Sequence, residues 1–228
     1  MIYLGGGGSE VDEANIWDLA FKAGQRVVIW PFAMPSTRWQ GTQEWVTKSL
    51  ARFGDFASIS LGLQGPDFGL HDADIVVIPG GNTFRLLDHL QRNGLLPALR
   101  NFLDNGGRIY GGSAGALILG TSVAITDSSV GGQDDNIIAD LRGKEGLNVL
   151  GGCVSYPHFG VGADNFEGHC HRWSQEHNVT VIGMPETCGL QFDPSGRALN
   201  AGPSPAHVFT PDGQRTVWAP NTTLSFPL

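Results

Sequence analysis

The sequence predicts an α/β fold in which a mostly parallel sheet is flanked by helices. Short apolar runs alternate with segments of helical periodicity over residues 1–119, which is typical of βαβ units. The run 73–81, ADIVVIPGG, is apolar almost throughout, as expected for a strand buried on both faces. Alternating segments broken by Pro/Gly turns predict antiparallel hairpins at 188–202 and 206–220. No linker or repeat is visible, so we expect residues 1–228 to form a single domain.

Each expected element has a local reason. Short apolar runs that end near glycine or proline predict strands at 1–4, 26–31, 56–61, 73–81, 108–112, 147–159 and 179–186. Apolar residues at three- or four-residue spacing predict helices at 12–24, 42–54, 82–94, 96–107, 114–119 and 164–178. The strand at 147–159 is expected to return to the same sheet after an irregular, acidic and glycine-rich excursion.

The composition excludes several classes of function. A net charge of −8 opposes binding to a nucleic-acid backbone, which requires a basic face, so we expect no nucleic-acid partner. No apolar run approaches the roughly 20 residues of a membrane span, and the first residues do not resemble a secretory signal. The three cysteines lack CxxC spacing and are expected to be reduced thiols. We therefore expect a cytoplasmic protein without a membrane partner.

The stretch GGGGSE at 5–10 follows the first expected strand and could in principle hold a phosphate. Counted from Gly5, however, the third glycine of a G-x-G-x-x-G fingerprint is replaced by Glu10, and no P-loop motif occurs. We therefore expect no nucleotide and no other cofactor. The glycines are interpreted as a tight turn that faces the substrate.

Ser113 is the candidate nucleophile. It lies in YGGSAGA, a G-x-S-x-G pattern between an expected strand and an expected helix, which is the context of a nucleophile elbow. Small neighbours permit a tight turn that leaves the hydroxyl clear of the sheet. The alternative is a serine that caps a buried helix.

A nucleophilic serine needs a base and an acid that orients the base. His158 is the histidine that ends an apolar strand, as Ser113 does, and the alternative is a structural histidine. Glu186 follows a third strand end and is the candidate acid. Asp127, Asp134 and Asp135, in the irregular segment after Ser113, are rival acids.

Backbone N–H groups near the same sheet edge are candidates for an oxyanion hole. Gly80 and Gly81 end the strand at 73–81, and Ala114 follows the serine. Asn82 comes next and is a candidate for substrate binding, although Asn82 or Thr83 could instead cap the following helix.

A metal site is not expected. Glu167, His169, Cys170 and His171 are close in sequence, but His169 and His171 point about 200° apart on a helix and are poor joint ligands. We interpret this cluster as solvated side chains of a helix.

Four segments together resemble the peptidase E family of serine peptidases, which includes aspartyl dipeptidases and cyanophycinase. They are IPGGNTFRLL, GGSAGALIL, SYPHF and VIGMPET, and they lie in the family's order within residues 75–190. The resemblance implies a fold similar to class I glutamine amidotransferases. It places Ser113 on the family nucleophile, His158 on its base and Glu186 on its acid, with the oxyanion hole at the GGN glycines and Ala114.

The resemblance also implies a small site for short peptides. Aspartyl dipeptidases carry an arginine-containing stretch after the histidine, and here that region reads FEGHCHRWSQEH, so Arg172 is the candidate partner of a substrate carboxylate. Arg38, in the segment MPSTRWQ, is a second candidate. We expect a serine exopeptidase with Asp-X dipeptidase or carboxypeptidase-type specificity, in a chain that could form a homodimer. The alternatives are another amidase or esterase on this fold, or a non-catalytic protein that binds small molecules.

Overall fold

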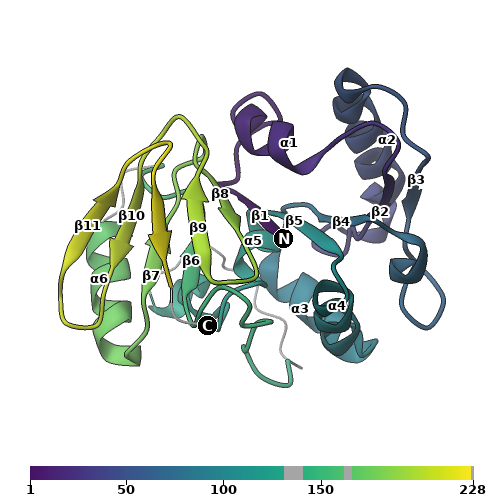
Figure 1. The fold of residues 1–228 in the computed structure, drawn as a ribbon. Coiled ribbons are helices and arrows are strands. Elements are labelled where there is room, and N and C mark those ends of the chain that lie inside the picture. The colour runs from purple at the N-terminus through teal and green to yellow at the C-terminus, as the bar shows by residue number, and fades with distance from the viewer. Residues whose placement is uncertain (131–140, 162–165, 227–228) are drawn as a thin grey trace.

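The strands divide into two sheets in the computed structural model, which describes residues 1–130, 141–161 and 166–226 (Figure 1). The larger sheet has eight strands in the order β12-β9-β8-β1-β5-β4-β2-β3, and the smaller has four in the order β11-β10-β7-β6. The two sheets together form the mixed α/β architecture that the sequence predicts.

The strands are short and mostly buried. The parallel part of the larger sheet comprises β1 (Ile2–Gly5), β2 (Arg26–Ile29), β3 (Ser58–Leu61), β4 (Ile75–Ile78) and β5 (Arg108–Gly112). Its antiparallel extension comprises β8 (Gly189–Phe192), β9 (Arg197–Asn200) and β12 (Thr223–Ser225). The smaller sheet comprises β6 (Val154–Tyr156), β7 (Val181–Gly183), β10 (Ala206–Phe209) and β11 (Arg215–Trp218). The expected C-terminal hairpins are therefore present as β8–β9 and β10–β11.

Helices lie on both faces of the larger sheet and also against the smaller sheet. They are α1 (Ala14–Ala20), α2 (Trp39–Leu50), α3 (Thr83–Arg92), α4 (Leu95–Asp104), α5 (Ala114–Leu117) and α6 (Phe166–His177). In Figure 1, α1 and α2 lie above this sheet and α3 and α4 below it, while α6 packs against the smaller sheet. Single turns of 3₁₀ helix connect some of these elements, at Ser36–Arg38, Ala51–Phe53, Leu70–Asp72, Ala124–Thr126 and Ser128–Val130.

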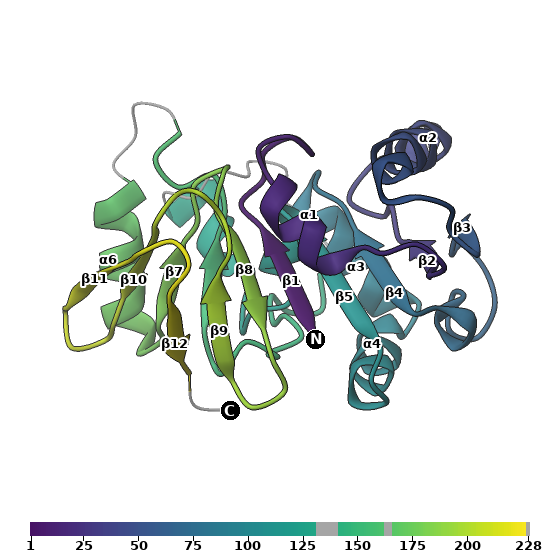
Figure 2. The same ribbon diagram turned by 45° about the horizontal axis from the view of Figure 1, so that its top comes forward.

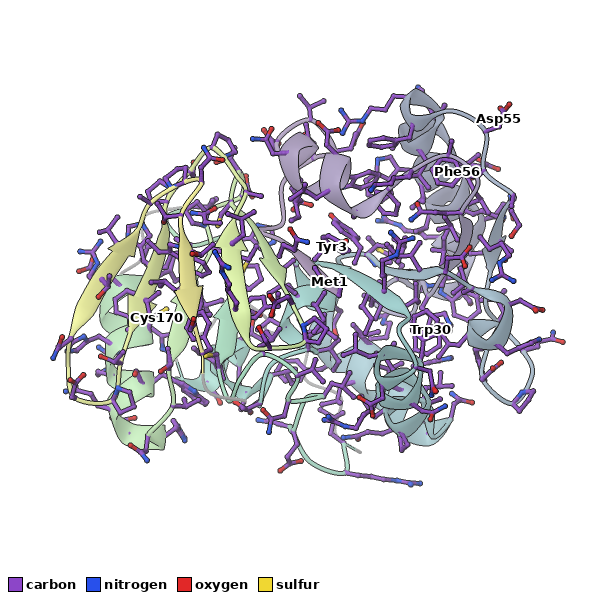
Figure 3. The ribbon with its side chains drawn as sticks, in the orientation of Figure 1. Met1, Tyr3, Trp30, Asp55, Phe56 and Cys170 are labelled. Atoms are coloured by element: carbon purple, nitrogen blue, oxygen red, sulfur yellow. The ribbon has the colours of Figure 1, made fainter. Side chains whose placement is uncertain are left out.

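Alternate residues of the central strands enter different cores. Tyr3, Val27 and Val77 pack with α1 and α2, whereas Leu4 and Val76 pack with the helices on the other face. This alternation is the two-residue period of a strand covered on both sides. Figure 3 labels Tyr3 and Trp30, which lie on opposite faces of the sheet.

The strand expected at 147–159 does not join the larger sheet, contrary to the expectation, and the strand expected at 179–186 lies with it in the smaller sheet. β1 pairs with β5 on one side and with antiparallel β8 on the other, so neither of its edges is open to β6 or β7. β6 and β7 pair in parallel with each other, and β10 extends them. Strand pairing depends on contacts between distant segments, which local periodicity does not report.

The carboxyl ends of β1, β4 and β5 meet at one edge of the larger sheet, at the top of Figure 2. The loops after β6 and β7 reach the same edge, because His158 donates its backbone N–H to the Gly6 carbonyl and Gly6 donates to the Cys188 carbonyl. Ligands of open α/β sheets bind at such carboxyl edges. Among the described residues, no helix is long and apolar enough to cross a membrane.

Candidate active site

Ser113 forms a sharp turn between β5 and α5. Its backbone has φ 50° and ψ −111°, which residues other than glycine rarely adopt. The Ser113 N–H donates to the Gly5 carbonyl over 3.3 Å, and this bond ties the turn to the end of β1. The resulting strand–turn–helix geometry is that of a nucleophile elbow.

The small residues of the motif are required by close packing. A Cβ at Gly115 would overlap the carbonyl oxygen of Ile78, at the end of β4. A Cβ at Gly80 would lie 3.0 Å from the Ser113 Cβ. The loop after β4 therefore passes directly beside the serine.

His158 and Glu186 complete a chain of hydrogen bonds that begins at Ser113. The Ser113 Oγ lies 2.8 Å from His158 Nε2. On the other side of the ring, His158 Nδ1 lies 2.9 Å from Glu186 Oε1. The three side chains come from three different loops, after β5, β6 and β7.

This arrangement selects one tautomer of the imidazole. The Glu186 carboxylate accepts a hydrogen bond from Nδ1–H, so the proton of the neutral ring lies on Nδ1. The lone pair of Nε2 is then free to accept a hydrogen bond from the Ser113 hydroxyl. A serine held in this way can lose its proton to the ring as it attacks an electrophilic carbon. The geometry is suited to acyl transfer.

Three backbone N–H groups near Ser113 have no acceptor within the ranges that the structure describes. They belong to Gly80, Gly81 and Ala114, the three candidates for an oxyanion hole. The side chain of Asn82 accepts the Arg85 N–H over 2.7 Å and caps α3. α5 has four residues instead of the six expected, so no long helix dipole lies behind the N–H of Ala114.

Asp127, one of the rival acids, forms an ion pair with Lys144. Its carboxylate is 2.6 Å from Lys144 Nζ and accepts the Ser129 N–H. Burial alone would raise the pKa of Asp127, but these hydrogen bonds and the Lys144 charge outweigh it and hold the pKa below its ordinary value. The other two rival acids, Asp134 and Asp135, lie outside the described residues.

The candidate cations are both exposed. Arg172 lies on the outer side of α6, and Arg38 ends the 3₁₀ turn before α2. Neither guanidinium forms an ion pair with a described residue. The structure brings neither of them into contact with Ser113.

The cluster at 167–171 is partly buried, which corrects the expectation of solvated side chains. His169 is 4% exposed and its Nε2 hydrogen-bonds the Ile125 carbonyl over 2.7 Å, while Cys170 is fully buried. Burial lowers the pKa of His169. Among the described ranges, no group of three or more His, Cys, Asp or Glu side chains could hold a metal ion.

Two cavities lie away from Ser113. One of about 520 Å³ is lined by residues around Asp74 and Arg108, and one of about 790 Å³ by residues around Met1 and Phe192. Both are near the amino ends of the parallel strands. Their positions do not alter the assignment of the candidate site, which rests on the hydrogen-bonded chain.

Glu13 is a buried residue near the site that the sequence interpretation missed. It is 3% exposed and its Oε1 accepts the Gly7 N–H over 2.8 Å. A signal was present in the sequence: Glu13 shares the helical stripe of Ile16, Trp17 and Ala20, which are all buried. A carboxylate buried in an apolar stripe needs hydrogen-bond donors, and here the Gly7 N–H and the Tyr110 hydroxyl supply them.

Comparison with known proteins identifies the family of this chain. The model of peptidase family S51 matches residues 1–198. A protein named Peptidase E, from Shigella flexneri serotype 5b (strain 8401), is 28% identical over 188 residues, which cover 78% of this chain and 77% of that protein.

Two solved structures share the fold. A peptidase from an acI-B1 Actinobacterium has a TM-score of 0.69 and 19% identity, covering 99% of this chain and 96% of its own. A protein from Listeria monocytogenes EGD-e has a TM-score of 0.68 and 19% identity, covering 88% and 97%. The family match extends over most of the chain, including all three residues of the hydrogen-bonded chain, and the chain belongs to peptidase family S51 as a serine peptidase.

Proposed function

We propose that this serine peptidase is an exopeptidase that hydrolyses short peptides through Ser113, His158 and Glu186. The observation that carries the proposal is the unbroken chain from Ser113 Oγ to Glu186, with contacts of 2.8 Å and 2.9 Å. The relatives named Peptidase E support a peptide substrate.

In the first step, Ser113 Oγ attacks the scissile carbonyl carbon while His158 Nε2 accepts the hydroxyl proton. The imidazolium that forms is stabilised by Glu186 at Nδ1. The carbonyl oxygen becomes an oxyanion, and the N–H groups of Gly81 and Ala114 donate to it.

Collapse of the tetrahedral intermediate breaks the C–N bond. His158 then donates its Nε2 proton to the leaving amine, and an ester between Ser113 and the acyl part of the peptide remains. Water attacks this ester with His158 again as the base, which releases the acid and restores Ser113.

Substrate preference depends on which carboxylate of the peptide an arginine side chain binds. Arg172 and Arg38 are exposed and have no ion-pair partner among the described residues, so either can bind a carboxylate. A cation at the side chain of the first residue gives Asp-X dipeptidase specificity. A cation at the terminal carboxylate gives carboxypeptidase-type release.

A peptide panel distinguishes these cases. Free Asp-X dipeptides, other free dipeptides, N-blocked dipeptides and tripeptides are incubated with the wild type and with Ser113→Ala, and the released amino acids are identified by mass spectrometry. Cleavage of unblocked Asp-X alone indicates a dipeptidase. Release of C-terminal residues from N-blocked peptides indicates a carboxypeptidase. Cleavage that persists in Ser113→Ala excludes the proposed nucleophile. Matched amide and ester substrates are run beside the panel, and cleavage of the esters alone indicates the esterase alternative.

A reducing compartment suits the thiols of this chain. Cys153, Cys170 and Cys188 are free and buried, and burial raises the pKa of each thiol. This supports a cytoplasmic location, which cell fractionation followed by an activity assay would test.

A further inference from the structure

The four-glycine loop, Gly5–Gly8, contacts every member of the candidate triad. Its Gly5 carbonyl accepts the Ser113 N–H over 3.3 Å, and its Gly6 carbonyl accepts the His158 N–H over 2.8 Å. A Cβ at Gly8 would lie 2.6 Å from the Glu186 carbonyl oxygen. The loop therefore holds the backbones of Ser113 and His158 by hydrogen bonds and passes close to the backbone of Glu186.

Gly7 is the point at which the loop meets the catalytic ring. Its φ of 102° is a conformation that favours glycine, and a Cβ there would overlap the His158 imidazole. The backbone of Gly7 thus lies against the imidazole of His158. A displacement of Gly7 would change the space available to the ring.

Glu13 holds Gly7 in this position. Its Oε1 accepts the Gly7 N–H over 2.8 Å, and a Cβ at Gly5 would overlap the same carboxylate. The other oxygen, Oε2, accepts the Tyr110 hydroxyl and lies 3.4 Å from Trp17 Nε1. The side chain lies inside the protein, between α1 and the strands β1 and β5.

We propose that Glu13 is a positioning residue for catalysis: through the Gly7 N–H it fixes the glycine loop against His158 and so keeps the ring aligned with Ser113. The inference rests on the proposed function of the triad. Glu13 has no direct contact with the reacting atoms in this arrangement, and it acts through the backbone of Gly7.

The donors around Glu13 explain why a carboxylate occupies this position. Gly7, Tyr110 and Trp17 all present N–H or O–H groups, and an ionised carboxylate can accept from all of them. Hydrogen bonds to a charged acceptor are stronger than those to a neutral one. Protonation of Glu13 removes the negative charge, so the hydrogen bond from the Gly7 N–H to Oε1 becomes weaker.

Glu13 changes protonation state in the neutral range. Burial raises its pKa to about 7, against the opposing effect of the hydrogen bonds from Tyr110, Gly7 and Trp17. The titratable groups that face it are Tyr110 from β5 and Cys188 before β8, and burial keeps both neutral by raising the pKa of each. Among the described residues, no cation forms an ion pair with Glu13.

Glu13→Gln separates positioning from a general structural role. Gln is neutral at every pH, so its amide oxygen can accept the Gly7 N–H only as an uncharged and therefore weaker acceptor, while its NH₂ group takes the place of Oε2 beside Tyr110 and Trp17. Its control is Ser174→Ala, which removes a buried hydroxyl that donates to the Val179 and Phe209 carbonyls, at α6 and away from the glycine loop.

The test measures how fast diisopropyl fluorophosphate labels Ser113. In this reaction Ser113 Oγ bonds to phosphorus, fluoride leaves, and the serine proton passes to His158, so the rate reports the Ser113–His158 pair without a peptide substrate. At pH 8 we expect labelling of Glu13→Gln to be about tenfold slower than that of the wild type. At pH 5.5 the two rates should converge, because Glu13 of the wild type is then protonated as well.

Three outcomes would overturn the proposal: equal rates at pH 8, a ratio that does not change with pH, or an equal loss in Ser174→Ala. The NMR resonance of the His158 Nδ1–H proton gives a second readout that does not depend on reactivity. Glu13→Gln should shift or broaden it at pH 8, and an unchanged resonance contradicts the proposal. If no peptide is cleaved but these effects are seen, the proposed substrate is wrong and the role of Glu13 stands.

Discussion

Ser113 adopts a backbone conformation that costs about 1–3 kcal/mol for a residue with a side chain. The surrounding structure enforces it through the bond from Ser113 N–H to Gly5 and the packing of the loop after β4. His158 also has a positive φ, of 55°, at the beginning of the loop after β6. Both strained residues lie on the same side of the sheet, where their side chains meet at 2.8 Å.

Glu186→Gln tests the role of the acid. The amide cannot stabilise the imidazolium and can favour the wrong tautomer of His158, so we expect kcat to fall by about 10²–10⁴-fold with little change in KM. Steady-state kinetics on the best substrate of the panel measures this. The matched variant is Asp127→Asn, which breaks the pair with Lys144 and should affect stability more than kcat. A greater loss of kcat in Asp127→Asn than in Glu186→Gln would contradict the assignment.

At the scale of elements, the site depends on how closely β4 and α5 approach each other. Gly115 faces the Ile78 carbonyl, and neither backbone has room to move because both residues lie in the core. We expect Gly115→Ala to lower the free energy of unfolding by about 3 kcal/mol and to displace the elbow, with loss of activity.

Gly41→Ala is the control for this substitution. Gly41 lies within α2 with nothing within 4 Å of an added Cβ, so alanine there should stabilise the protein by about 0.5–1 kcal/mol. Urea denaturation measures both variants. A Gly115→Ala variant as stable as Gly41→Ala would show that the close approach is not real.

Local sequence signals predicted the elements better than their assembly. The apolar run before Gly80 and the segment before Ser113 gave β4 and β5 correctly, because burial on both faces leaves a continuous apolar pattern. The separate sheet of β6 and β7 was not predicted, since it depends on β8 pairing with β1. The strand β12 was also missed, because it is short and mostly exposed and carries no pattern.

In the candidate site, too, some residues could be predicted from local sequence signals and others could not. Ser113, His158 and Glu186 each follow a strand, which identified them as candidates. His158 and Glu186, however, follow strands of the smaller sheet, and their loops meet Ser113 through backbone bonds to Gly6 that the sequence does not report. The hydrogen bond from Gly7 to Glu13 could not be predicted either, because it depends on how α1 packs over β1 and β5. The roles of Arg172 and Arg38 in substrate binding remain predictions.

At the scale of the whole molecule, one apolar core is continuous across both sheets. It joins Leu4 of β1 and Val76 of β4 with Val154 of β6 and Val208 of β10. We therefore propose that residues 1–228 form a single domain, and we expect a single cooperative transition on unfolding by urea.

The buried carboxyl of Glu13 links the stability of this domain to pH. Its pKa rises from 4.5 in the unfolded chain to about 7 in the folded protein, so the folded state binds the proton more tightly. This tighter binding stabilises the folded state fully below pH 4.5, and the stabilisation is lost as the pH rises through 7. Glu13→Gln is neutral throughout. Relative to the wild type, it should therefore gain about 2–3 kcal/mol of stability between pH 5 and pH 8.

Urea denaturation of both proteins at the two pH values measures this gain. A stability difference that is the same at pH 5 and pH 8 would show that Glu13 does not titrate between them. A gain in stability at pH 8 combined with slower labelling of Ser113 would identify a group kept for function at a cost in stability.

The most direct test of the central claim is to trap the nucleophile. The wild-type protein is treated with diisopropyl fluorophosphate, and the modified residue is located by mass spectrometry of the digested chain while peptide hydrolysis is followed in parallel. We predict one diisopropylphosphoryl group, on the peptide that contains Ser113, with hydrolysis lost in proportion to labelling and no labelling of Ser113→Ala. Labelling at another residue, or hydrolysis that continues after Ser113 is fully modified, would contradict the account.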